Sequence, residues 1–178
     1  MTTVISPEEE ANRLRAGVLG SIDGITSTAA VVVGVAGAGA SRSILLLTGM
    51  VTLIGGALSM GGGEWTSVSA GRDAEVVDGV PAAELASPWS AALASGVSFA
   101  VGALVPVLAV VLPPVEWRVP VTFGAVAVAL AVAGVTSARM AGTPVRVAVR
   151  RTMLGGGVAM LATWGFGLLA ASLLGHRA

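Results

Sequence analysis

The chain has 178 residues, of which 54% are hydrophobic and only 11% are charged, and its mean hydropathy is +0.88. Soluble domains carry about 25% charged residues, so this composition indicates a membrane protein. The sequence has no cysteine, one histidine and zero net charge. It therefore excludes disulfide frameworks and thiol chemistry, and we expect no nucleic-acid partner because the chain offers no bulk electrostatic attraction to one.

Five stretches are nearly free of charge, and each is long enough to cross a bilayer core, which takes roughly 20 apolar residues. They are residues 16–38, 44–70, 89–112, 119–138 and 152–175. They lack the polar stripe at helical spacing that a soluble helix presents, and the short alternating segments of a membrane β-barrel are also absent. The sequence predicts an all-α polytopic membrane protein, with residues 1–178 forming a single domain of five transmembrane helices.

The arginines predict the orientation, because cytoplasmic segments of membrane proteins are enriched in Arg and Lys. Five spans place the two termini on opposite sides of the membrane. With the N-terminus inside, the cytoplasmic segments hold Arg13, Arg15, Arg72, Arg139, Arg146, Arg150 and Arg151, and the outer segments hold Arg42, Arg118 and Arg177. We therefore expect a cytoplasmic N-terminus and an outer C-terminus. Trp89 and Trp117 lie at predicted span ends, where interfacial anchors are expected.

The first predicted span contains an aspartate, Asp23, about 10 Å from the cytoplasmic end at a rise of about 1.5 Å per residue. An ionisable group at this depth costs a few kcal/mol on insertion scales, so it should face a bundle interior, a partner or an aqueous path. We interpret Asp23 as a functional residue. Two structural alternatives remain: the carboxylate caps a helix break at Gly24, or a protonated carboxyl bonds to a neighbouring helix.

Small residues form one face of the same predicted helix. The residues are Gly17, Gly20, Gly24 and Thr28. Such a face lets two helices approach closely. It predicts either a contact between helices of one chain or a dimer interface.

The second half of the second predicted span contains a methionine and a glutamate, Met60 and Glu64, which share a helix face because they are four residues apart. Helix rise places Met60 about 24 Å from the outer end, at a depth similar to that of Asp23. The intervening glycines 61–63 are expected to loosen the helix. Carboxylate oxygens with a thioether suit Fe²⁺ or Mn²⁺ and disfavour Mg²⁺ and Ca²⁺. Alternatively, Met60 only packs and Glu64 is an interfacial acid.

Three runs of sequence resemble the vacuolar iron transporter (VIT) family. LRAGVLGSIDGITST at residues 14–28 is similar to the first helix of that family, GALSMGGGEWTSVS at residues 56–69 to its second, and ASPWSAALAS at residues 86–95 to the start of its third. The resemblance implies a transporter of divalent iron and manganese that acts as a proton antiporter. It also implies a homodimer whose pore lies between the subunits, lined by Asp23 and Met60, with Glu64 as the acid of a Gly-Glu motif.

The sequence departs from the family pattern in two places. Ile22 stands where the family usually has asparagine, and this removes a polar pore group. Many members also insert a glutamate-rich metal-binding domain between the second and third helices, whereas here that connection is only residues 71–88. The chain therefore resembles the shorter, nodulin-like branch. The acids of the connection are Asp73, Glu75, Asp78 and Glu84; we favour a solvated loop over a metal funnel.

The leading hypothesis is a homodimeric exporter that moves Fe²⁺ or Mn²⁺ from the cytoplasm through the bilayer in exchange for protons, without a cofactor. The alternative is a non-transporting membrane scaffold built from the same helices. We expect no enzyme, because the sequence has no nucleophile–base set, no H-E-x-x-H motif and no phosphate loop. A lysine-free composition rich in Ala, Val and Gly suggests a GC-rich bacterium and hence the plasma membrane.

Overall fold

The computed structural model describes residues 7–81 and 85–175. The chain forms helices α1 (Pro7–Gly37), α2 (Arg42–Val77), α3 (Pro88–Val111), α4 (Arg118–Ala141) and α5 (Val145–Leu173), with a short 3-10 helix η1 (Val115–Trp117) before α4. Each of the five α-helices is long and apolar enough to cross a membrane, and the described residues contain no strand. The predicted all-α fold with five spans is confirmed, and the chain is an integral membrane protein.

Local sequence explains where several helices begin and end. Ser41 and Ser87 precede α2 and α3, and each hydroxyl accepts a hydrogen bond at 3.4 Å from a backbone N–H three residues later. Pro88 is the first residue of α3. A backbone N–H at this position has no acceptor within the helix, so proline, which lacks one, costs no hydrogen bond there. Gly142 ends α4 at φ 62°, a left-handed conformation that glycine adopts without strain.

Three helices extend by seven or more residues beyond the apolar stretches that predicted them. α1 begins at Pro7 instead of residue 16, α2 continues to Val77 instead of residue 70, and α5 begins at Val145 instead of residue 152. Each extension carries charged side chains, because apolar composition marks the part of a helix that lies in the bilayer and not the end of its hydrogen bonding. α2 also runs without interruption through the glycines at 61–63, and α3 continues through Pro106.

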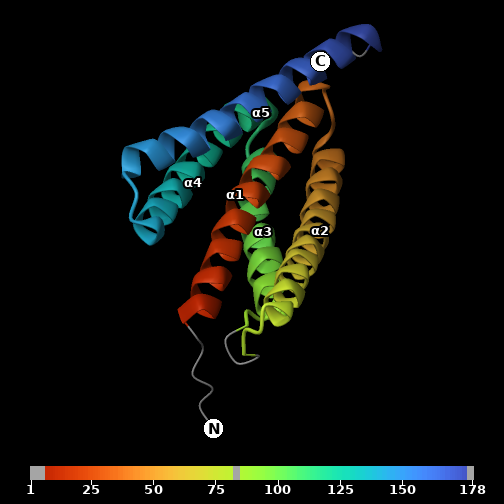
Figure 1. The fold of residues 1–178 in the computed structure, drawn as a ribbon. Coiled ribbons are helices and arrows are strands. Elements are labelled where there is room, and N and C mark those ends of the chain that lie inside the picture. The colour runs from red at the N-terminus through yellow and green to blue at the C-terminus, as the bar shows by residue number, and fades with distance from the viewer. Residues whose placement is uncertain (1–6, 82–84, 176–178) are drawn as a thin grey trace.

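α1 is the central helix and contacts all four other α-helices (Figure 1). α2 and α3 lie along one side of α1, whereas α4 and α5 form a hairpin on the other side. α5 crosses α1 near the C-terminal end of α1. Among the described elements, α2 contacts only α1 and α3. Leu47, Val51 and Leu58 of α2 are therefore largely exposed, as expected for side chains that meet lipid or a partner.

One cluster of buried hydrophobic residues lies between α1 and the α4–α5 hairpin. Ile25, Val33, Leu130 and Met160 are buried there, and Trp164 packs against them. Trp89 and Trp117 are exposed at helix ends. The tryptophans are thus divided between packing and surface positions.

The glycine face of α1 packs against α3 of the same chain. A Cβ atom on Gly20 or Gly24 would overlap the backbone carbonyl of Ser95 or Phe99. Gly17 lies opposite Ser98, and Thr28 is fully buried. Of the two contacts predicted for this face, the structure shows the one within the chain.

Candidate functional site

Asp23 lies half-buried on α1, beside the face that packs against α3. α1 is helical on both sides of it, so the alternative of a carboxylate that caps a helix break at Gly24 is wrong. Its Oδ1 accepts a hydrogen bond of 2.5 Å from the Ser27 hydroxyl, a partner on its own helix. An ionised carboxylate has about four acceptor positions. Asp23 is therefore held in place by Ser27 and keeps the capacity to bind a cation.

A cleft of about 470 Å³ between α1 and α2 brings together the three residues predicted to line a path. Asp23 contributes from α1, and Met60 and Glu64 contribute from α2. Their shared cleft follows from the helix faces: Met60 and Glu64 are one turn apart, and α1 and α2 are in contact.

Hydroxyl groups that were not among the predicted site residues also line this cleft. They belong to Ser27, Thr52 and Ser59. Thr52 and Ser59 are seven residues apart, and Ser59 is next to Met60, so helical periodicity would have placed them on the same side of α2. The signal was present, but a serine or threonine in an apolar span usually bonds to its own helix. Thr52 does so, donating to the Thr48 carbonyl at 2.8 Å.

A second cleft of about 600 Å³ adjoins the first and lies between α1, α2 and the α4–α5 hairpin. Asp23 and Met60 line both clefts, so they lie where the two meet. Arg151 and Thr152 of α5 line the second cleft, and Ile22 adds an apolar surface to it. A single carboxylate and a single thioether are thus accessible from two sides of α1.

Glu64 is buried, with 7% of its side chain exposed, and it forms an ion pair with Arg15. Arg15 Nη2 donates to Glu64 Oε1 at 3.0 Å, which joins the N-terminal half of α1 to α2. A buried carboxylate needs such a partner, because removing an unpaired charge from water costs several kcal/mol. In the sequence, Arg15 indicates only the orientation of the chain, and nothing there predicts this pairing.

The acids at the end of α2 do not join the cleft. Asp73, Glu75 and Asp78 are exposed and are absent from its lining, and Glu84 lies outside the described residues. Within the parts of the chain that the structure describes, no three His, Cys, Asp or Glu side chains gather as a metal-binding group. The donors that this chain brings together are two carboxylates, one thioether and a few hydroxyls.

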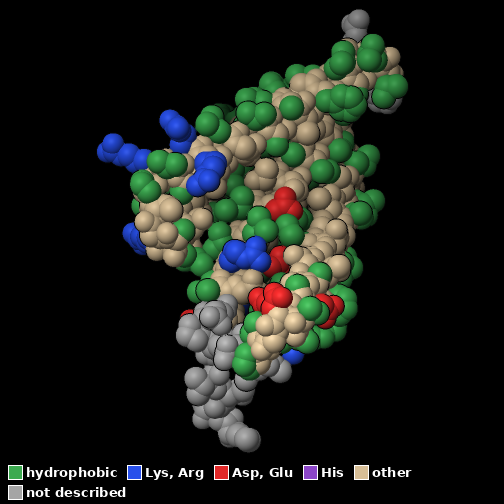
Figure 2. Space-filling view, viewed as in Figure 1, with side chains coloured by type: hydrophobic (Ala, Val, Ile, Leu, Met, Phe, Trp, Pro, Cys, Tyr) green, Lys and Arg blue, Asp and Glu red, His purple; other side chains and the backbone are tan. Residues whose placement is uncertain are grey.

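Charged side chains gather in separate areas of the surface (Figure 2). Arginines cluster over the α4–α5 turn, whereas acidic side chains lie over α2 near its C-terminal end. The arginines are Arg139, Arg146, Arg150 and Arg151, all exposed, and residues 119–175 contain no acid. The hairpin is therefore purely cationic next to a cleft that contains carboxylates.

Comparison with known proteins identifies the family of the chain. The sequence matches the VIT family over residues 14–79 and 77–168. It is 36% identical to vacuolar iron transporter homolog 4 of Arabidopsis thaliana, over 96% of this chain and 90% of that protein. It is also 39% identical to vacuolar iron transporter homolog 5 of Oryza sativa subsp. japonica, over 87% of this chain and 79% of that protein. The family match and these identities, which extend over nearly the whole chain, show that the chain belongs to the VIT family.

Proposed function

We propose that this protein transports divalent iron across its membrane, with Mn²⁺ as a second cargo, along a path that passes Asp23 and Met60. The observation that supports this most is that these two side chains line both clefts. A carboxylate with a thioether prefers Fe²⁺ or Mn²⁺ to Mg²⁺ or Ca²⁺. Iron is also the metal in the names of the Arabidopsis and rice relatives.

The path is proposed to be completed by a second copy of the chain. Both clefts contain the proposed donors, and large apolar side chains of α2 are exposed beside them. A homodimer would cover these surfaces and add a second Asp23 and a second Met60. Two carboxylates from two subunits would supply oxygen ligands that one chain lacks.

Export from the cytoplasm in exchange for protons is the proposed direction and coupling. A carboxylate held in a site with little water can bind either a proton or a metal ion, but not both at once. Asp23 is the group proposed to alternate between them. We retain the bacterial plasma membrane as the proposed location, although the names of the relatives describe vacuolar proteins.

Two features modify this proposal. Ile22, which stands where the family usually has asparagine, lines the second cleft with an apolar surface. The connection between α2 and α3 contains no room for a metal-capturing domain, since α2 ends at Val77 and α3 begins at Pro88. Metal would therefore enter directly from solution, and we expect its apparent affinity to depend on the cleft itself.

Transport by purified protein in liposomes tests the role of Asp23. Losing even a residue that orients a metal ligand costs about 10–100-fold in affinity or activity, so Asp23→Ala and Asp23→Asn should lower Fe²⁺ and Mn²⁺ flux by at least roughly tenfold. Glu116→Gln is the matched control, because Glu116 is an exposed acid in η1 and lines neither cleft. A pH gradient should stimulate flux in the wild type and in the control.

Two outcomes would contradict the proposal. Undiminished flux in a folded, dimeric Asp23→Ala protein would remove Asp23 from the path. Absence of flux for both ions in folded, dimeric wild type, with and without the gradient, would favour the non-transporting scaffold. Light scattering on the same preparations measures whether the protein is a dimer.

A further inference from the structure

Arg15 holds one of the carboxylates of the cleft. Its guanidinium Nη2 lies 3.0 Å from Glu64 Oε1 and 3.0 Å from Asn12 Oδ1, to both of which it donates. Glu64 is 7% exposed, whereas Arg15 is 61% exposed. The carboxylate is therefore fixed in the protein, and the guanidinium is the partner that can leave.

The pair is positioned at one end of the cleft. Arg15 precedes Asp23 by eight residues on α1, which is about 12 Å along the helix axis. Glu64 follows Met60 by one turn on α2 and lines the same cleft as Asp23 and Met60. An ion that enters from the end of the molecule where α1 begins meets the Arg15–Glu64 pair before it reaches Asp23.

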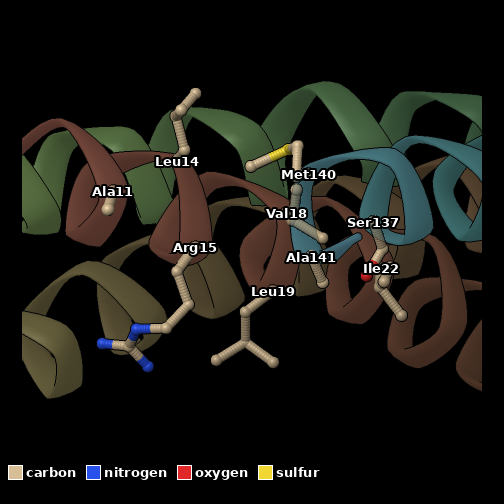
Figure 3. Close-up of a pocket in the computed structure, with 9 residues that line it drawn as sticks. All are labelled: Ala11, Leu14, Arg15, Val18, Leu19, Ile22, Ser137, Met140 and Ala141. Carbon is tan, nitrogen blue, oxygen red and sulfur yellow. The ribbon is translucent and has the colours of Figure 1, made fainter. Parts of the chain in front are cut away.

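Arg15 also has room to move away from Glu64. It lies at the edge of a separate cleft of about 530 Å³ between α1 and α4, lined mainly by apolar side chains. Figure 3 shows its guanidinium pointing away from Leu14, Val18 and Met140. Displacing the guanidinium would therefore disturb no buried side chain of the core.

We propose that Arg15 is a tethered cation that competes with the transported ion for Glu64 and thereby selects for divalent charge. This inference rests on the proposed function, because it requires the ion to pass Glu64. A guanidinium and a divalent ion compete for one buried carboxylate, since their positive charges repel each other at contact distance in the low dielectric of the site. A divalent ion gains enough from Glu64 and the nearby donors to displace Arg15, whereas a monovalent ion has half the charge and does not.

Mn²⁺ binding to the purified full-length protein, measured by titration calorimetry, tests this competition. If the pair is formed in about nine molecules out of ten, the apparent Kd for Mn²⁺ is raised about tenfold. Arg15→Gln should therefore lower that Kd about tenfold. Arg15→Lys restores the positive charge and should reverse most of this change. Arg13→Gln is the matched control, because Arg13 is an exposed arginine on the same helix that lines none of these clefts.

A double-mutant cycle and two further readouts separate competition from a general effect on structure. In a Glu64→Gln background, Arg15→Gln should leave the Kd unchanged, because the carboxylate for which the cations compete is gone. In transport, Arg15→Gln should lower KM without raising kcat. Excess K⁺ should weaken Mn²⁺ binding to Arg15→Gln but not to wild type, compared with N-methylglucamine chloride at the same ionic strength.

Weaker or unchanged Mn²⁺ binding in Arg15→Gln overturns the inference. If Arg15→Gln does not fold, Asn12→Ala is measured in its place. Loss of the Asn12 acceptor should loosen Arg15 and lower the Kd for Mn²⁺ about twofold. An unchanged or raised Kd in Asn12→Ala would also overturn the inference. Asp23→Ala in the same assay distinguishes the two proposals. If it weakens binding while Arg15→Gln does not strengthen it, only the competition fails. If wild type binds no Mn²⁺, both proposals fail.

Discussion

Met60 is the only sulfur donor that lines both clefts within the described structure, and Asp23 lines both of them as well. Met60 also packs against a small apolar cluster between α2 and α3, which consists of Leu53, Phe99 and Ala103. The Met60 side chain therefore packs against apolar neighbours and is also accessible to an ion from the two clefts. A variant that keeps the side-chain volume but removes the sulfur distinguishes the two roles. If Met60 only packs, transport should be unaffected; if it contacts the ion, transport should fall.

Met60→Leu should reduce transport while leaving stability nearly unchanged. The two side chains have similar volumes, and such exchanges usually cost less than about 1.5 kcal/mol. Loss of the thioether should lower Fe²⁺ and Mn²⁺ flux several-fold and reduce the preference for Fe²⁺ over Mg²⁺. Met50→Leu is the matched control on the same helix, since Met50 is exposed and lines neither cleft. Equal flux ratios in both variants would show that Met60 only packs.

α1 combines two requirements on adjacent faces. Its glycine face must lack side chains so that the backbone of α3 can approach, and the adjacent face must hold Asp23 at the clefts. The close contact with α3 fixes the rotation of α1 about its own axis, and this rotation sets the position of Asp23. Backbone packing is thus one physical cause of the site geometry.

Gly20→Ala should destabilise the protein, because the added Cβ would overlap the Ser95 carbonyl and force the two helices apart. Overpacking of this kind costs about 1–3 kcal/mol. Thermal unfolding in detergent, followed by tryptophan fluorescence, should show a clear fall in Tm. In the control Gly124→Ala, a Cβ meets open space, and alanine favours a helix by about 0.5–1 kcal/mol, so its Tm should be unchanged or higher. A Tm for Gly20→Ala as high as that of the control would contradict the close packing of α1 on α3.

At the scale of the whole molecule, charge is distributed unevenly between the two halves of the bundle. Exposed arginines lie at the turn between α4 and α5. Apart from Glu116 in η1, the acids of the sequence lie before or within α1, within α2 or between α2 and α3. Arg118, near the other end of α4, is buried. The exposed positive charge of the hairpin is therefore at its turn, which under the positive-inside rule should be cytoplasmic.

Labelling of single cysteines tests this orientation. The chain has no cysteine of its own, so each introduced thiol is the only one. Thr143→Cys in the α4–α5 turn and Val115→Cys in η1 are both exposed and are separated by α4. A membrane-impermeant maleimide should label Val115→Cys in intact cells and label Thr143→Cys only after permeabilisation. The reverse pattern would show that the N-terminus is outside.

The number of spans could be predicted from the sequence, because the bilayer imposes a length that each apolar stretch meets by itself. The similar depth of Asp23 and Met60 follows in the same way from helix rise, and both residues line the same two clefts. The helix ends at Pro7 and Val77 were not predictable from hydropathy. There the polar ends of α1 and α2 continue the helix outside the apolar region that hydropathy measures.

Composition and the order of residues along the chain determined the class of the protein, its five spans and its intramembrane acids, since each is a property of one segment. Only the tertiary structure decided which helices meet. It placed the glycine face of α1 against α3 and Glu64 beside Arg15, a residue 49 positions away. The periodicity of a helix indicates which of its residues share a face, but the neighbour that this face meets depends on how all five helices pack together.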